Sequence, residues 1–275
     1  MPGRSMTQHN CDLCNSDKSI PIPVDSVPGE ELPHICQGCG FVYVKNRRST
    51  ADIAHEWDTI WGEGYTSAWP AVQARLFFVA EWFNQKYGWD NKRTLDIGAG
   101  EGDFLKMIRT RGAIVSGVEP AMENVKKLIT AGIPTHRGPI ESFQSTDVDV
   151  VTILWTLENC GDCIGMLERA RECLGPDGRL VVATGSRLMV PFKKPLSQYL
   201  GSNAPDLHCF RFSLNTLKAT MRLAGFEPED CNFWGDSDWL VVTAARSENY
   251  RTVEAPFDKP DDVADFFRKW QECFP

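Results

Sequence analysis

Short apolar runs alternate with amphipathic segments through the middle of the chain. The apolar runs lie at residues 94–98, 114–120, 147–155 and 179–185, and the segments between them lie at 103–112, 122–132 and 163–175. Those segments carry apolar side chains at three- and four-residue steps, the spacing of amphipathic helices. Strands and helices in this alternation build a parallel sheet covered by helices on both faces. The pattern therefore predicts an α/β fold, a Rossmann-like doubly wound sheet, over residues 91–245.

The flanking segments carry other patterns. Residues 49–90 place apolar side chains at helical spacing and predict helices that link to the core or cover it as a lid. A further helix is predicted after Ser213, which suits the N-cap, and Gly225 suits its C-terminal stop. The tail, residues 246–275, predicts an amphipathic helix that packs back on the protein. Its apolar positions on one face are Val263, Phe266, Phe267 and Trp270.

Residues 1–48 have prolines, cysteines and no helical periodicity, which predicts a separate small module. Two C-x-x-C pairs, Cys11 with Cys14 and Cys36 with Cys39, face each other across a loop. Four thiolates complete a tetrahedral shell and leave no position for water. We therefore expect a zinc-ribbon module in which these four cysteines bind a structural Zn²⁺ ion. The later C-x-x-C pair, residues 160–163, lacks a partner pair and is expected to stay unligated.

Composition narrows the function classes. The 275 residues are 42% hydrophobic, and 29 Lys and Arg against 37 Asp and Glu give a net charge of −8. An acidic chain is a poor partner for a polyanion, so nucleic acid is disfavoured. No apolar run approaches the roughly 18 residues of a membrane span, and the start has no signal-peptide core. A long, unsignalled chain with ten cysteines is expected to keep them reduced in the cytoplasm, with no membrane partner.

A glycine-rich loop follows the first strand of the predicted sheet. Glycines at 98, 100 and 102 allow the backbone to turn sharply and approach a ligand closely. A dinucleotide fingerprint would require glycine at 103, where this chain has Asp103. Glu119 ends the next strand, where a carboxylate can accept two hydrogen bonds from ribose hydroxyls. Loop and carboxylate together predict a site for a nucleoside-containing cofactor.

Glycines at alternate positions after the acid Asp96 resemble the first motif of the class I S-adenosylmethionine-dependent methyltransferases. The segment 138–143 resembles the family's third motif, which borders the adenine ring, and the resemblance covers most of residues 91–245. The layout, with its cysteine module, is similar to zinc-ribbon-bearing bacterial methyltransferases, among them nucleotide-sugar C-methyltransferases. The resemblance implies S-adenosylmethionine as cofactor. The implied cofactor-binding residues are Asp96, Gly98, Ala99, Gly100, Gly102, Phe104, Glu119, Pro120, Ile140, Glu141 and Trp155.

The catalytic candidates are few. Relatives commonly carry H-x-L-E-H after the fourth strand, and this chain has Trp155 and Asn159 at the histidine positions. Glu158 is retained and could serve as a base, hydrogen-bond the cofactor ammonium, or cap the next helix. His208 has an ordinary pKa suited to a general base and lies in a segment expected to cover the pocket. Tyr65 could close over the cofactor or touch the acceptor.

We therefore expect methyl transfer to a small, anionic acceptor: a nucleotide-linked sugar, a glycan or a natural-product intermediate. Lys193 and Lys194 could meet such an anion. One alternative is an RNA base methyltransferase, which needs a basic face, and residues 45–48 hold the densest cationic cluster near the cysteines. A second is a catalytically silent module that binds cofactor or partner. An oxidoreductase is disfavoured by Asp103.

Overall fold

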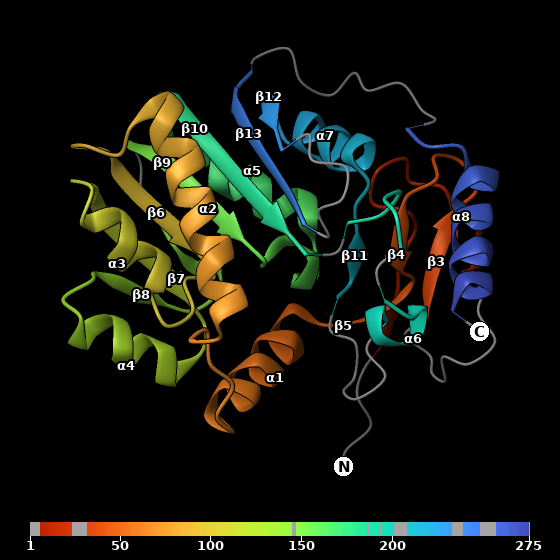
Figure 1. Cartoon of the computed structure of the whole chain (residues 1–275), viewed down its shortest axis with the longest axis horizontal. Coiled ribbons are helices and arrows are strands. Elements are labelled where there is room, and N and C mark those ends of the chain that lie inside the picture. The colour runs from red at the N-terminus through yellow and green to blue at the C-terminus, as the bar shows by residue number, and fades with distance from the viewer. Residues whose placement is uncertain are drawn as a thin grey trace.

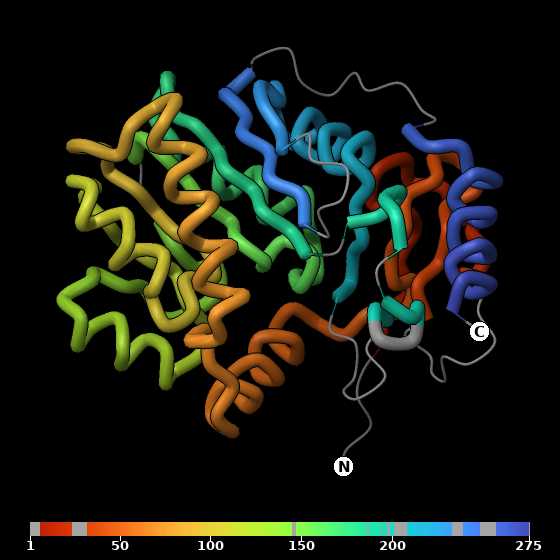
Figure 2. Tube along the Cα trace, viewed as in Figure 1, coloured from red at the N-terminus to blue at the C-terminus, as the bar shows by residue number. Residues whose placement is uncertain are grey.

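The computed structural model describes residues 6–23, 32–144, 147–185, 187–192, 194–200, 208–232, 239–247 and 257–274 (Figures 1 and 2). Its centre is a seven-stranded sheet in the order β12-β13-β10-β9-β6-β7-β8. The strands from β8 to β10 are parallel, whereas β13 runs antiparallel to both β10 and β12. The bounds are β6 Arg93–Ile97, β7 Ile114–Glu119, β8 Thr135–Arg137, β9 Val148–Leu154, β10 Leu174–Thr184, β12 Phe226–Cys231 and β13 Leu240–Arg246.

Helices cover both faces of this sheet (Figure 1). On one face α2, α3 and α4 pack on alternate strand residues such as Val181 and Ala183. On the other, α5 and α7 pack on the intervening residues, such as Leu180 and Val182. Both faces are buried, which explains why the strands read as almost continuous apolar runs. The bounds are α1 Thr50–Gly62, α2 Pro70–Tyr87, α3 Asp103–Arg109, α4 Met122–Thr130, α5 Cys163–Cys173 and α7 Leu214–Leu223.

The N-terminal segment forms a second, smaller sheet, in the order β11-β4-β3-β2, beside a β1-β5 pair. Its last strand, β11, comes from a part of the chain that follows β10 and α6, and it pairs antiparallel with β4. Helix α8 contacts β3, so the end of the chain lies beside its beginning (Figure 2). The bounds are β1 Met6–Gln8, β2 Ser19–Pro21, β3 Pro33–Cys36, β4 Val42–Val44, β5 Asn46–Arg48, α6 Leu196–Tyr199, β11 Phe210–Arg211 and α8 Pro260–Cys273.

The two sheets share one hydrophobic core. Phe41, whose ring centroid lies 5.9 Å from that of Phe210, belongs to the same buried cluster as Leu180 and Val182 of β10. The buried Arg47 bonds the carboxylate of Asp12 and also donates to the carbonyl of Gly161, which precedes α5. The cysteine-bearing segment is therefore continuous with the α/β domain, whereas the sequence pattern predicts a separate module.

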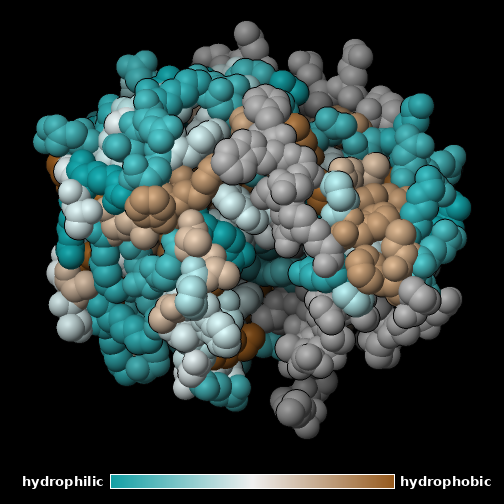
Figure 3. All heavy atoms as spheres, viewed as in Figure 1, coloured by the Kyte–Doolittle hydropathy of each residue, from teal (hydrophilic) through white to brown (hydrophobic). Residues whose placement is uncertain are grey.

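The helix predictions outside the core also agree with the structure. Helix α7 begins after Ser213, whose side chain and that of Thr216 form a capping box. Helix α8 buries Phe267 and Trp270 against the small sheet and α6, not against the central sheet. The face seen in Figure 3 is mostly hydrophilic, with separate hydrophobic areas. Among the described residues, no helix combines the length and hydrophobicity that a membrane span needs.

The cationic cluster at residues 45–48 does not form a basic face. Arg47 is buried against Asp12, and Arg48 is buried in an ion pair with Glu56. The ammonium of Lys45 donates to the backbone carbonyl of Asp17. Because these cations serve internal contacts, the observation that motivates an RNA substrate loses its support.

Candidate active site

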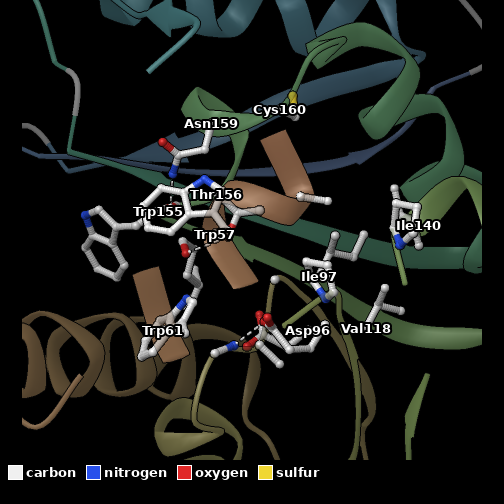
Figure 4. Close-up of a pocket in the computed structure, with 18 of the residues that line it drawn as sticks. Trp57, Trp61, Asp96, Ile97, Val118, Ile140, Trp155, Thr156, Asn159 and Cys160 are labelled. Atoms are coloured by element: carbon white, nitrogen blue, oxygen red, sulfur yellow. Dashed lines mark hydrogen bonds between the residues drawn. The ribbon is translucent and has the colours of Figure 1, made fainter. Parts of the chain in front are cut away.

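A cavity of about 240 Å³ opens at the carboxyl ends of β6, β7 and β9, where ligands bind in open α/β sheets. The glycine loop forms its floor, and α1 and α2 contribute its walls. Figure 4 shows Asp96, Ile97 and Val118 on one side and Trp155, Thr156 and Asn159 on the other. The cavity therefore lies between the loop after β6 and the segment after β9.

Two glycines of the loop are required for different reasons. Gly98 has φ +75°, and a Cβ there would lie 2.3 Å from Oγ1 of Thr156, across the cavity floor. Gly102 has φ +77°, and a Cβ there would lie 2.4 Å from Cδ2 of Leu128 in α4. A side chain at either position would therefore clash as well as strain the backbone. Gly98 lines the cavity, but Gly102 does not: it allows α3 to pack close to α4.

Glu119 is fixed at the end of β7 by the loop that it faces. Its carboxylate accepts hydrogen bonds from the backbone N–H of Gly100 at 2.8 Å and of Ala121 at 2.9 Å, and from Asn124 at 3.5 Å. Burial raises the pKa of this carboxyl group, and the two backbone donors oppose that rise. A carboxylate offers about four lone-pair positions, so Glu119 retains capacity for a ligand hydroxyl.

Asp96 lies deeper, at the end of β6. Thr152 donates a hydrogen bond of 2.6 Å to its Oδ1 atom. Burial raises the pKa of Asp96 to about 7, and the negative charge of Glu119 adds to the rise. The protonation state of the cavity floor is thus sensitive to pH near neutrality.

The loop between α1 and α2 is tied to the glycine loop. Oε2 of Glu101 accepts from the hydroxyl of Thr66 and from the backbone N–H of Ser67. The hydroxyl of Ser67 lies 2.8 Å from Oε2 of Glu101 and 2.6 Å from Oδ2 of Asp103, and can donate its proton to either carboxylate. Burial would raise the pKa of Glu101, but hydrogen bonds from Lys127 and from these donors lower it to about 2. The loop is therefore held by an ionised carboxylate at any ordinary pH.

This connection places aromatic side chains over the glycine loop. Trp61 and Tyr65 lie edge to face, 4.8 Å apart, and both line the cavity. Trp57, one turn earlier on α1, lines it too. Neither tryptophan was a predicted site residue. Their spacing, at residues 57, 61 and 65, is also that of a helix packed on a core, so the sequence pattern alone favours packing.

The wall opposite the glycine loop is built around Trp155. Its φ of +53° is rare for a side chain of this size. Its backbone N–H donates to Ala183 at 2.6 Å, and its carbonyl accepts from Nδ2 of Asn159 at 2.9 Å. The guanidinium of Arg75 lies 4.7 Å from the centre of the Trp155 ring. These contacts fix the indole in the cavity wall.

Three buried polar atoms in this wall have no hydrogen-bond partner. They are Nε1 of Trp57, Nε1 of Trp155 and Oδ1 of Asn159. All three residues line the cavity. A buried polar atom without a partner costs about 1–3 kcal/mol, so native proteins leave few of them.

The structure places the predicted cofactor residues around one space. Asp96, Gly98, Ala99 and Gly100 belong to the cavity lining, whereas Gly102 does not. The other predicted residues that line the cavity are Phe104, Glu119, Pro120, Ile140, Glu141 and Trp155.

Of the catalytic candidates, only Tyr65 lines the cavity. Glu158 is buried behind it and accepts a hydrogen bond of 2.9 Å from the N–H of Gly185, and burial raises its pKa. His208 precedes β11, beside the small sheet, where burial and the charge of Lys194 lower its pKa to about 4. In the described structure neither Glu158 nor His208 belongs to the cavity lining, and their catalytic roles stay predictions.

The four predicted zinc ligands converge. The Sγ atoms of Cys11, Cys14, Cys36 and Cys39 all lie within 4.8 Å of one another. Sγ of Cys11 is 3.5 Å from that of Cys39, and Sγ of Cys14 is 3.4 Å from that of Cys36. Zinc–sulfur bonds of about 2.3 Å in a tetrahedron require sulfur atoms about 3.8 Å apart. The four thiols therefore fit a zinc ion. The later pair, residues 160 and 163, is buried as free thiols.

Comparisons with known proteins agree with this geometry. A family model described as "Methyltransferase domain" matches residues 73–230, more than half of the chain. A ubiquinone biosynthesis O-methyltransferase from Schizosaccharomyces pombe is 31% identical over 144 residues, which are 49% of this chain and 52% of that protein. One from Azorhizobium caulinodans is 30% identical and matches 43% of this chain and 53% of its own length. The chain thus spans about half the length of these curated relatives.

Solved structures share the fold. A methyltransferase from Thermotoga maritima, described as a possible histamine N-methyltransferase, is 20% identical and superposes with a TM-score of 0.55 over 70% of this chain and 99% of its own. A Burkholderia thailandensis 1,6-didemethyltoxoflavin-N1-methyltransferase is 18% identical, with a TM-score of 0.56 over 78% and 99% of the two chains. The Rossmann-like class I fold predicted from the sequence is confirmed by these structures, and the family model confirms the predicted methyltransferase domain. This chain belongs to the methyltransferase domain family.

Proposed function

We propose that the protein transfers a methyl group from S-adenosylmethionine to a hydroxyl group of a small, uncharged, largely apolar ring compound. The observation that carries the cofactor is the buried carboxylate of Glu119, fixed against the N–H of Gly100 at the end of β7. S-adenosylmethionine supplies an electrophilic methyl group on a sulfonium. In this proposal Glu119 accepts a hydrogen bond from its ribose, Asp96 faces its cationic methionine part, and Ile140 borders its adenine.

The acceptor class follows from the charges around the cavity. Among the described lining residues, Arg75 is the sole cation. The lining carboxylates are Asp96, Glu101, Asp103, Glu119 and Glu141. A diphosphate would face these carboxylates without compensating cations, whereas an uncharged ring can pack on the indoles of α1.

The expected anionic acceptor thus lacks support. Lys193, which was expected to meet it, lies outside the described residues. The ammonium of Lys194 lies over the ring of Tyr199, 5.5 Å from its centre, and away from the cavity lining. The curated relatives are described as ubiquinone O-methyltransferases, which does not support a nucleotide-linked sugar or a glycan and favours an oxygen acceptor.

Methyl transfer requires mainly that the acceptor oxygen be aligned with the methyl group of the cofactor. Methyl transfer is an in-line displacement, and the aromatic walls and the tied α1–α2 loop would hold the acceptor in place and exclude water. The described cavity lining includes no histidine that could act as a base. A neutral hydroxyl on an unsaturated ring is acidic enough to release its proton to water as the methyl group is transferred, so it needs no strong base, which further favours this kind of acceptor.

We also propose that a structural Zn²⁺ ion occupies the four-cysteine cluster. Four thiolates close the shell, so the ion would stabilise the fold and take no part in methyl transfer. The cytoplasmic location expected from the sequence stays a prediction.

Titration calorimetry tests the cofactor. S-adenosylmethionine and S-adenosylhomocysteine are expected to bind, and NAD is not, because Asp103 and the acidic loop oppose its pyrophosphate. Binding of NAD alone would contradict the proposal. Failure of all three to bind a folded protein would favour the catalytically silent module.

Cofactor binding is expected to weaken as the pH falls. Because the pKa of Asp96 is about 7 in the folded protein, the group is mostly neutral at pH 6 and ionised at pH 8. A cationic ligand part prefers the ionised form, so binding at pH 6 must first remove a proton. We expect the Kd for S-adenosylhomocysteine to rise about tenfold from pH 8 to pH 6. Calorimetry measures this Kd at each pH. Asp96→Asn should bind S-adenosylhomocysteine more weakly, and its Kd should depend less on pH. An equally steep pH dependence in that variant would show that another group titrates.

A further inference from the structure

The wall formed by Trp57, Trp155 and Asn159, here called the polar wall, gathers unpaired polar atoms in one cavity. Two indole N–H donors and one amide oxygen are buried without partners. Figure 4 shows these residues together, on the opposite side of the cavity from Asp96 and Val118. Unpaired buried polar atoms in a cavity are satisfied when a ligand with matching groups enters.

The amide of Asn159 has a fixed orientation. Its Nδ2 donates to the carbonyl of Trp155, so the free end is the oxygen Oδ1, which only accepts hydrogen bonds. Trp155 is itself held with φ +53° by its bonds to Ala183 and Asn159. A strained backbone kept by surrounding contacts is typical of functional sites. The polar wall is thus built in advance of the ligand.

We propose that the polar wall is the specificity determinant for the methyl acceptor. In this proposal, which rests on the proposed function, Oδ1 of Asn159 accepts from a hydroxyl or N–H of the acceptor, and the indole N–H groups of Trp57 and Trp155 donate to a neighbouring carbonyl or hydroxyl oxygen. The selected acceptor is therefore a flat, uncharged ring that carries a donor beside an oxygen acceptor. The cofactor takes the opposite side, where Asp96 and Glu119 lie.

The charges around the wall agree with an uncharged group. An acceptor carboxylate would face the amide oxygen of Asn159, which repels it. The nearest described cation, Arg75, lies over the face of the Trp155 ring and already interacts with it. A ring that packs between the indoles gains burial without an unpaired charge.

The test uses a matched pair of small probes, 2-methoxyphenol and 1,2-dimethoxybenzene, with the protein saturated with S-adenosylhomocysteine. 2-Methoxyphenol has a hydroxyl donor beside an ether oxygen, whereas 1,2-dimethoxybenzene has the same two oxygens and no donor. We expect 2-methoxyphenol to bind about tenfold more tightly, as calorimetry or ligand-observed NMR measures. Asn159→Ala should reduce that preference to about twofold or less, because it removes the oxygen that accepts from the hydroxyl. Trp57→Phe should weaken both probes to a similar extent, because both retain the oxygen that accepts from its indole N–H. Trp69→Phe, at an exposed indole outside the cavity, is the control and should retain the preference.

Two further readouts separate this role from a structural one. Trp57→Phe removes a donor that has no partner, so its Tm should equal or exceed that of the wild type, whereas the loss of a structural hydrogen bond would lower it. The Kd for S-adenosylhomocysteine should stay within twofold in both variants. Equal binding of the two probes to the wild type, an unchanged preference in Asn159→Ala, unchanged binding of both probes by Trp57→Phe, or weaker cofactor binding in either variant would each overturn the proposal. Failure of the wild type to bind S-adenosylhomocysteine would instead contradict the proposed function.

Discussion

Glu119→Gln is expected to weaken the binding of S-adenosylhomocysteine by about 10- to 100-fold. The wild-type carboxylate already accepts from Gly100, Ala121 and Asn124, and its remaining lone-pair position would accept one charge-assisted hydrogen bond from the ribose, worth about 1.5–3 kcal/mol. Glutamine keeps the size of the side chain but replaces one oxygen by a donor, which then faces the backbone N–H of Gly100 or Ala121. Calorimetry at pH 8 measures the loss, and thermal unfolding verifies that the variant is folded.

Glu123→Gln provides the matched control. Glu123 lies on α4, close to Glu119 in sequence, but it is exposed and pairs with Lys126. Its substitution should leave the Kd within twofold of the wild-type value, because exposed ion pairs contribute little. If the Kd of Glu119→Gln for S-adenosylhomocysteine lies within threefold of the wild-type value, the carboxylate of Glu119 does not bind the ribose.

The second large effect is expected at the cysteine cluster. Cys36→Ser should abolish stoichiometric zinc and lower the Tm by at least about 10 °C, because structural zinc contributes about 10–16 kcal/mol in small domains and only part of it survives with three thiolates. The loss should spread beyond the small sheet, since Cys36 and Cys39 belong to the same core as Leu157 and Phe210. Metal analysis and differential scanning calorimetry measure the two effects.

Cys273→Ser is the control for loss of a thiol. Cys273 lies at the end of α8, exposed and outside the cluster, so both zinc content and Tm should match the wild type. Full stability of Cys36→Ser, or of the wild-type protein after zinc is removed with a chelator, would contradict a structural metal.

The central sheet could be predicted from the sequence because its strands and helices are each marked by a pattern of neighbouring residues. Each of the first three apolar runs is followed by its own amphipathic helix, and the glycine loop with Glu119 marks the edge where the parallel strands end. The capping residue Ser213 likewise marks the start of α7 within a few positions. Local patterns of this kind fix which residues lie near the cavity, which is why most predicted cofactor residues line it.

The features of the fold and of the site that could not be predicted depend on contacts between segments that are distant in sequence. Strand β11 has two residues and no pattern of its own, and only its pairing with β4 moves His208 away from the cavity. The same pairing joins the cysteine segment to the core, a contact that the composition change at residue 48 does not predict. The sequence does not predict the polar wall, because an indole at helical spacing, such as that of Trp57, is typical of a side chain packed in a core. That its N–H has no hydrogen-bond partner can be seen only in the three-dimensional structure.

The pairing of β4 with β11 also governs how this chain can fold. Tyr43 and Phe210 are partners although most of the protein separates them in sequence, and α8 reaches β3 from still further away. To form contacts between segments so far apart in sequence, the chain must lose loop-closure entropy before the contacts stabilise it. This requirement slows folding. During synthesis the cysteine segment emerges before β11 and α8, which lie in the final third of the chain and pack on it. The four thiols of the proposed zinc site are therefore exposed to solvent before these elements cover them.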